Sequence, residues 1–88
     1  MEKVYLLIAL YTFESATETE VEVFGTREKA LARFREVLTN EKQDSWLNEL
    51  DGVHIDTEDY ERGKFDAWVD GRASEFMTTI YIKEEEVK

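Results

Sequence analysis

The chain begins with an apolar run, Lys3 to Phe13, in which both sets of alternating positions are hydrophobic. One set is Val4, Leu6, Ile8 and Leu10, and the other is Tyr5, Leu7, Ala9 and Tyr11. A strand presents alternate side chains to opposite faces, so this run predicts a central strand that is covered on both sides. One cover is expected to be a helix, and the other a further part of the fold or a partner chain.

An antiparallel hairpin is predicted next, because the segment Glu14–Thr19 is polar and turn-like and the sequence then alternates. In "TEVEVFG", Val21 and Val23 are predicted to face inward and Glu20 and Glu22 to face outward.

One principal amphipathic helix is predicted after Gly25, with Thr26 as its N-cap. Its apolar positions repeat as in a helix that lies on a sheet, and they are Ala30, Leu31, Phe34, Val37 and Leu38. The helix is expected either to continue or to restart at Asp44–Ser45, carrying Trp46, Leu47 and Leu50, and to end at Asp51–Gly52.

The remaining segments complete the sheet. Residues 53–64 are expected to form a surface loop with a short strand or helical turn, and "FDAWVDG" fits either a strand or a helical turn. The segment "EFMTTIYIKEEEV" predicts a final strand, with Phe76, Thr78, Ile80 and Ile82 on one face and Met77, Thr79 and Tyr81 on the other.

The pattern therefore predicts a single α+β domain over residues 1–88. Its antiparallel sheet has three to four strands in the order β-β-α-(loop)-β, and the main amphipathic helix packs on one face. The opposite face is expected to carry Tyr5, Leu7, Tyr11 and either Met77 or Tyr81. We expect either the loop segment or a second copy, in a homodimer, to cover that face.

The charge is strongly negative, with 21 acidic residues against 11 basic ones and a formal net charge of −10. The segment Asp44–Glu61 contains many carboxylates and no Lys or Arg. Such a charge repels nucleic acid and anionic membranes and attracts basic protein surfaces. The sequence has no cysteine and no apolar run near the ~20 residues that span a bilayer, so we expect a cytoplasmic protein.

The stretch "DGVHIDTEDYE" raises the question of a metal or catalytic site, because it joins the only histidine, His54, to a dense group of acids. A calcium loop needs alternating oxygen ligands and a central glycine, but Val53 and Ile55 occupy ligand positions. Zinc would require cysteines or further histidines. One histidine beside many acids, with Ser45 as a nominal nucleophile, is common by chance. We therefore predict no metal, no cofactor and no enzymatic activity.

The remaining interpretation of the negative charge is an acidic surface that binds a partner. Glu18, Glu20 and Glu22 follow one strand face at intervals of about 6.6 Å, which resembles a line of backbone phosphates. The predicted partner-binding residues are Glu18, Glu20, Glu22, Asp56, Glu58, Asp59, Glu61 and Trp68. The alternative is a merely solvated surface, in which the charges keep the sheet edge from pairing.

Two segments, "VEVFGTREKALARFREVLTNEKQDSW" and "FDAWVDGRASEFMTTIYIKEEEV", resemble small acidic proteins of bacteriophages and other bacterial mobile elements. The shared features are structural, and they are Phe24, Thr26, Glu28, Lys29, Ala30, Asp70 and Gly71. Most such proteins have no assigned function. Some inhibit host defence, including CRISPR effector nucleases, partly by imitating nucleic acid, so the resemblance implies an inhibitor without a catalytic residue.

The leading hypothesis is thus a non-enzymatic accessory protein that binds a basic, nucleic-acid-binding protein through its acidic surface. The alternative is a small interaction or assembly module that forms a homodimer through its apolar sheet face. A protein that sequesters a small molecule is a third class, and its pocket cannot be identified in the sequence.

Overall fold

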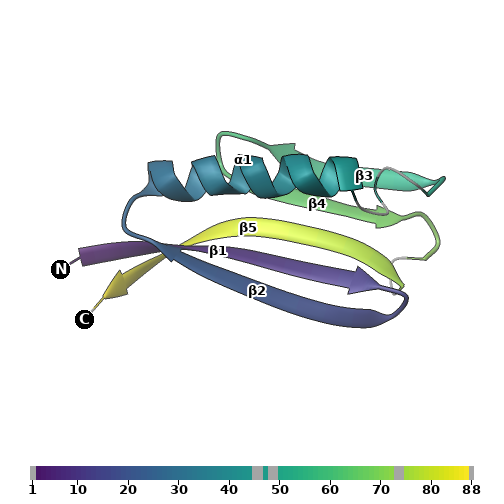
Figure 1. The fold of residues 1–88 in the computed structure, drawn as a ribbon, viewed down its shortest axis with the longest axis horizontal. Helices are drawn as coiled ribbons and strands as arrows, with labels where there is room; N and C mark the ends of the chain where they lie inside the picture. Colours follow the sequence, from purple (N-terminus) through teal and green to yellow (C-terminus); the bar gives the residue numbers. More distant parts are fainter. Residues whose placement is uncertain (1, 45–46, 48–49, 73–74, 88) are drawn as a thin grey trace.

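The computed structural model describes residues 2–44, 47, 50–72 and 75–87, and in them it shows one helix above a single antiparallel sheet (Figure 1). The elements in chain order are β1 Glu2–Phe13, β2 Ala16–Phe24, α1 Arg27–Asp44, β3 Val53–Asp59, β4 Lys64–Val69 and β5 Phe76–Val87. The spatial order of the strands is β2-β1-β5-β4-β3. In the described part of the chain, no helix is long and apolar enough to cross a membrane.

The centre of the sheet is the pair formed by β1 and β5, which are joined along their full length from Glu2 opposite Val87 to Phe13 opposite Phe76. Each central strand then carries a hairpin partner or neighbour on its outer side, β2 on β1 and β4 on β5. The β1–β2 turn is Glu14–Ser15, and both residues have positive φ angles of 50° and 71°. This geometry is that of a two-residue type I′ hairpin turn, whose twist matches that of the strands.

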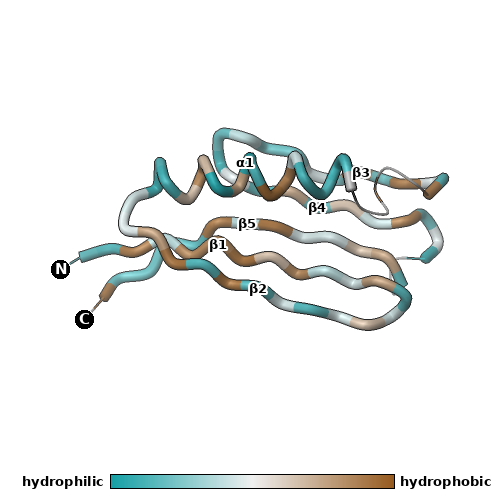
Figure 2. Tube along the Cα trace, in the orientation of Figure 1, coloured by the Kyte–Doolittle hydropathy of each residue, from teal (hydrophilic) through white to brown (hydrophobic). Residues whose placement is uncertain are grey.

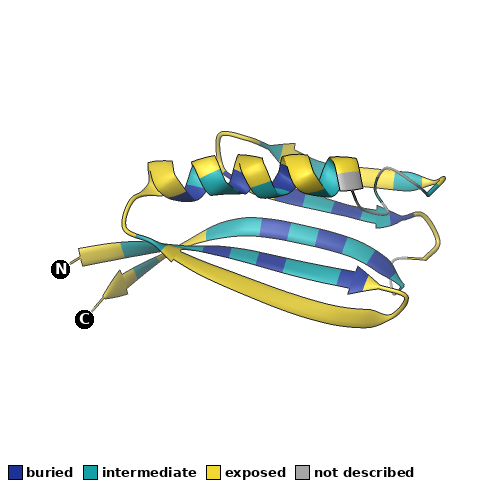
Figure 3. Ribbon diagram, viewed as in Figure 1, coloured by how far each residue is buried: buried dark blue, intermediate teal, exposed yellow. Residues whose placement is uncertain are grey.

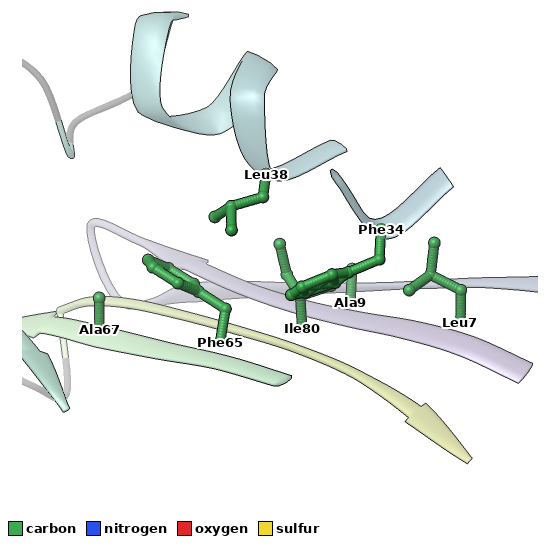
Figure 4. Packing of buried hydrophobic residues seen from close by; sticks show 7 residues of the cluster. All are labelled: Leu7, Ala9, Phe34, Leu38, Phe65, Ala67 and Ile80. Atoms are coloured by element: carbon green, nitrogen blue, oxygen red, sulfur yellow. The ribbon is translucent and has the colours of Figure 1, made fainter. Parts of the chain in front are cut away.

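The core lies between α1 and one face of the sheet (Figure 3). Figure 4 shows Phe34 and Leu38 pointing from α1 toward side chains of β1, β4 and β5. The residues that they meet are Leu7, Ala9, Phe65, Ala67 and Ile80, all of them buried. Small alanines on β1 and β4 leave room for the aromatic rings, so the helix can approach the sheet closely.

The α+β class and the antiparallel sheet under one amphipathic helix are confirmed, but the sheet has five strands instead of three to four. The extra strand is β3, which occupies most of the segment expected to be a surface loop with a short strand or helical turn, and it has a register shift between Ile55 and Thr57. The ambiguous "FDAWVDG" segment contributes most of β4. The short length of β3 and its bulge conceal the alternation that identifies strands. The predicted helix restart falls on Ser45 and Trp46, which lie outside the described residues.

The predicted faces of the first hairpin are reversed. Leu7 and Tyr11 lie on the helix side of β1, while Val21 and Val23 of β2 lie on the opposite side and are 53% and 63% exposed. The alternation itself is correct, but both faces of β1 are apolar, so the pattern alone does not choose which one meets the helix. Because the side-chain period is two, a wrong choice for β1 also inverts its paired strand β2.

Gly63, in the turn between β3 and β4, is buried and has a φ of +71°. A Cβ atom there would lie 3.0 Å from Leu31 Cδ2 and would overlap the Ile82 side chain. The turn is also bonded to β5, since the Ile82 amide donates to the Gly63 carbonyl at 3.1 Å.

We predict that Gly63→Ala destabilises the fold by about 2–4 kcal/mol, combining a left-handed backbone with overpacking. The matched control is Gly52→Ala, because Gly52 has a φ of +77° but nothing within 4 Å of the added methyl group. It should cost only about 1–2 kcal/mol. Urea unfolding measures both, and equal losses would show that the contact with Ile82 does not constrain the turn.

Candidate functional site

The side of the sheet that faces away from α1 is apolar, and we call it the open face. The strand registers place nine apolar residues of β1, β2, β4 and β5 on it, namely Val4, Leu6, Ile8, Leu10, Val21, Val23, Trp68, Met77 and Tyr81. Figure 2 shows hydrophobic residues following one another along β1. The single helix of the described chain packs on the other side, so no described element covers this surface. Contiguous exposed apolar surface is typical of a protein interaction site.

Charged residues on the open face include Asp66 and Lys64 on β4 and Lys83 and Glu85 toward the end of β5. Lys83 Nζ and Glu85 Oε1 are 2.8 Å apart at the end of β5. On β4, Asp66 Oδ1 accepts a hydrogen bond from Thr79 Oγ1 at 2.8 Å. On this face, β1 from Val4 to Thr12 and β5 from Met77 to Tyr81 carry no acidic side chain, although the molecule has a net charge of −10.

The predicted acids of β2 lie on the helix side of the sheet. Glu22 accepts a hydrogen bond from Arg33 of α1, with Oε2 and Nε 2.9 Å apart, and this bond raises the pKa of Arg33. Glu18 and Glu20 are exposed, and neither forms an ion pair with any residue the structure describes. Burial, with Glu41 and Glu20 nearby, raises the pKa of Tyr11, so that phenol stays protonated. Glu18, Glu20 and Glu22 therefore form a row on the surface of β2, in which the charge of Glu22 is offset by Arg33.

The second group of predicted acids lies at the opposite edge of the sheet, where Glu58 and Asp59 form hydrogen bonds within the fold. Glu58 of β3 pairs with Lys42 of α1 and accepts a hydrogen bond from Tyr60 Oη at 2.7 Å. Asp59 Oδ1 accepts hydrogen bonds from the amides of Glu61 and Arg62 at 3.1 and 3.0 Å, which fixes the turn after β3.

The other predicted residues of this region have different surroundings. Asp56 lies at the β3 bulge and is exposed, and the Glu61 carbonyl accepts a hydrogen bond from Arg27 at 2.9 Å. Trp68 lies on the open face, with its ring 5.0 Å from that of His54. The eight predicted residues are thus divided between two opposite edges of the sheet and one face, and they do not form one continuous patch.

The residues that sequence reasoning missed are the two exposed valines of β2 and the apolar row Val4, Leu6, Ile8 and Leu10 beside them. The apolar character of both faces of β1 predicted an uncovered face, but the prediction assigned it to Tyr5, Leu7 and Tyr11, which lie on the helix side.

In the part of the chain that the structure describes, no group of three or more acidic or histidine side chains is arranged to hold a metal ion. Comparison with protein-family models, with curated proteins and with solved structures finds no match to this chain. The surfaces of the molecule are therefore the basis on which we infer its function.

The Lys42–Glu58 pair gives a pH-dependent prediction. The bonds from Lys42 and Tyr60 lower the pKa of Glu58 below its ordinary value of 4.5. A depressed carboxyl pKa stabilises the fold above that value, and this contribution is lost as the pH falls through the folded-state pKa.

We predict that Glu58→Gln lowers the free energy of unfolding by about 1 kcal/mol at pH 7, since the pair is partly exposed. The difference in the free energy of unfolding between this variant and the unchanged protein should shrink as the pH falls below 4.5. Thermal unfolding from pH 7 to pH 3 measures it, with Glu36→Gln as a control, because Glu36 bonds Arg33 on the exposed side of α1. A difference that stays constant with pH would mean that the Glu58 charge does not stabilise the fold.

Proposed function

We propose that this chain is a non-enzymatic interaction module that assembles as a homodimer through its open face. The observation that supports this proposal is an apolar sheet surface that lies opposite the helix and that no described element covers. A two-layer fold of one helix and one sheet buries only one side of the sheet, so the other side must be polar or meet a partner.

The size of the sheet fits a dimer interface. Its strands contain 12, 9, 7, 6 and 12 residues from β1 to β5. With strands about 4.8 Å apart and a rise of about 3.3 Å per residue, the sheet covers roughly 700 Å² in projection. The accessible surface of its side chains exceeds this projection, and a standard interface buries about 800 Å² on each partner.

The distribution of charge favours a second copy as the occupant. Two molecules that each carry a net charge of −10 repel one another unless their contact surface is close to neutral. The open face comes close to this condition, because the β2 glutamates lie on the helix side, Glu85 pairs with Lys83, and the charge of Asp66 is balanced by Lys64 on the same face of β4. A basic partner would instead be attracted to the acidic edges.

We predict that the double substitution Val21→Lys/Val23→Lys weakens the dimer at least about 100-fold, because two ammonium groups would have to be desolvated in the interface. Both valines are more than half exposed in the single chain, so the fold should tolerate the change. Sedimentation velocity over a concentration series measures the dissociation constant.

The matched control is Glu18→Lys/Glu20→Lys, which adds lysines to the same strand on its helix side. This variant should dimerise no more weakly than the unchanged protein, and high salt should leave its dimer intact. A monomeric unchanged protein, or equal effects of the two double substitutions, would contradict assembly through the open face.

The second candidate function is the acidic one, in which the β2 row of Glu18, Glu20 and Glu22 binds a basic, nucleic-acid-binding protein. It is supported by the exposure and regular spacing of Glu18 and Glu20, which stand at about the 6.6 Å interval of a strand face. In this role the protein would be an inhibitor of the phage type, which imitates the charge of nucleic acid against a target such as a CRISPR effector. The acids of β3 contribute less, because most of their bonding capacity is used within the fold.

We predict that the chain captures a basic nucleic-acid-binding protein from bacterial lysate at low salt and releases it at high salt. The Glu18→Lys/Glu20→Lys variant should lose this capture, whereas Val21→Lys/Val23→Lys, which leaves the carboxylates in place, should weaken it less. Mass spectrometry of the bound fraction compares the three proteins, and capture that is indifferent to charge reversal on β2 would exclude the acidic row as the binding surface.

A further inference from the structure

The outer backbone edge of β2 is not paired with any strand that the structure describes. β2 is the outermost strand on its side of the sheet, and Figure 3 shows it exposed along its length. Its register with β1 runs without interruption from Ala16 to Phe24, whereas the other edge strand, β3, has a register shift. Bulges and prolines are common devices against pairing at a sheet edge, and β2 has neither.

The register identifies the backbone groups at this edge. In a two-residue hairpin the residues that flank the turn, here Phe13 and Ala16, form a hydrogen-bonded pair, and bonded and non-bonded pairs then alternate. Every second residue of β2 consequently directs its N–H and C=O groups away from β1. These residues are Thr17, Thr19, Val21 and Val23. These groups are spaced as another strand requires.

The side chains of β2 specify what such a strand would carry. On the helix side it presents the carboxylates of Glu18 and Glu20, and on the open-face side it presents Val21 and Val23. A neighbouring strand places its own side chains alternately on the same two faces. Basic side chains facing the glutamates and apolar side chains facing the valines would match both faces at once.

Pairing of β2 with β2 of a second copy is disfavoured by the same row. Antiparallel pairing would set the glutamates of the two copies on the same face of one continuous sheet, where like charges on neighbouring strands repel. A dimer through the open face leaves the β2 edge free, because stacked sheets meet through their side chains and not through their edges.

We propose that β2 is a docking strand for an extended segment of a partner protein in which basic and apolar residues alternate. The partner would add a sixth strand to the sheet by β-augmentation, with main-chain hydrogen bonds providing affinity and the two side-chain rows providing selectivity. This proposal rests on the acidic-row function above and names the class of partner that the row would select.

The test uses a short capped peptide of alternating lysine and valine, labelled for fluorescence anisotropy. Its control has the same composition with the lysines and valines grouped in blocks, so charge is equal and alternation is lost. The alternating peptide should bind the unchanged protein at least about tenfold more tightly than the block peptide, and added salt should weaken its binding.

Two substitutions of Thr19 distinguish the contribution of main-chain hydrogen bonds to peptide affinity from that of charge. Thr19→Pro removes an outward N–H group, and an edge strand tolerates proline where that group faces solvent. Thr19→Val changes the side chain and keeps the N–H. Thr19→Pro should lose about tenfold in affinity for the alternating peptide while Thr19→Val binds like the unchanged protein, and thermal unfolding verifies that both variants are folded.

Equal affinity of the two Thr19 variants would overturn strand docking. If charge reversal at Glu18 and Glu20 still abolished binding in that case, the acidic-row function would stand without its main-chain component. Equal, salt-independent binding of both peptides to the charge-reversed protein would overturn the docking strand and the acidic row together.

Discussion

The structure depends on a mismatch between one strand and one helix. β1 is apolar on both faces, and α1 covers only the face that carries Leu7 and Ala9. Phe34 and Leu38 fill the space above those residues, and the burial of this side fixes the register of every paired strand. The same choice leaves the second apolar face of β1 outside the core, and it directs the valines of β2 outward and its glutamates toward the helix.

The basic residues of α1 connect the helix to both edges of the sheet. Arg33 bonds Glu22 on β2, and Lys42 bonds Glu58 on β3. Two acids that belong to the predicted binding surface are therefore partly neutralised by the fold itself. Of the predicted acids that form no ion pair with a described residue, Glu18 and Glu20 lie on β2, beside an unpaired backbone edge and two exposed valines. Charge, hydrophobic surface and main-chain groups thus meet at one strand.

The sequence was sufficient for whatever depends on local periodicity. The alternation in β1, β2 and β5 and the helical repeat around Phe34 predict the α+β class, the hairpin and the cover of one sheet face. The sequence was insufficient for properties that depend on which of the two apolar faces of β1 meets the helix. Nothing local distinguishes Leu7 from Leu6 as the residue under the helix, and the position of the acids follows from that choice. The bulge between Ile55 and Thr57 similarly hides β3, and only pairing with β4 reveals it as a strand.

The position of β5 has a consequence for how the chain folds as it is synthesised. β5 lies between β1 and β4, although it follows both in the chain. Until β5 leaves the ribosome, the β1–β2 hairpin and the β3–β4 hairpin have no strand to join them, and the core lacks Ile80. Formation of the sheet must therefore await the longest sequence separation in the fold, which slows folding and prolongs the exposure of both apolar faces of β1. The risk of aggregation of the emerging chain is therefore greatest while β1 has left the ribosome and β5 has not.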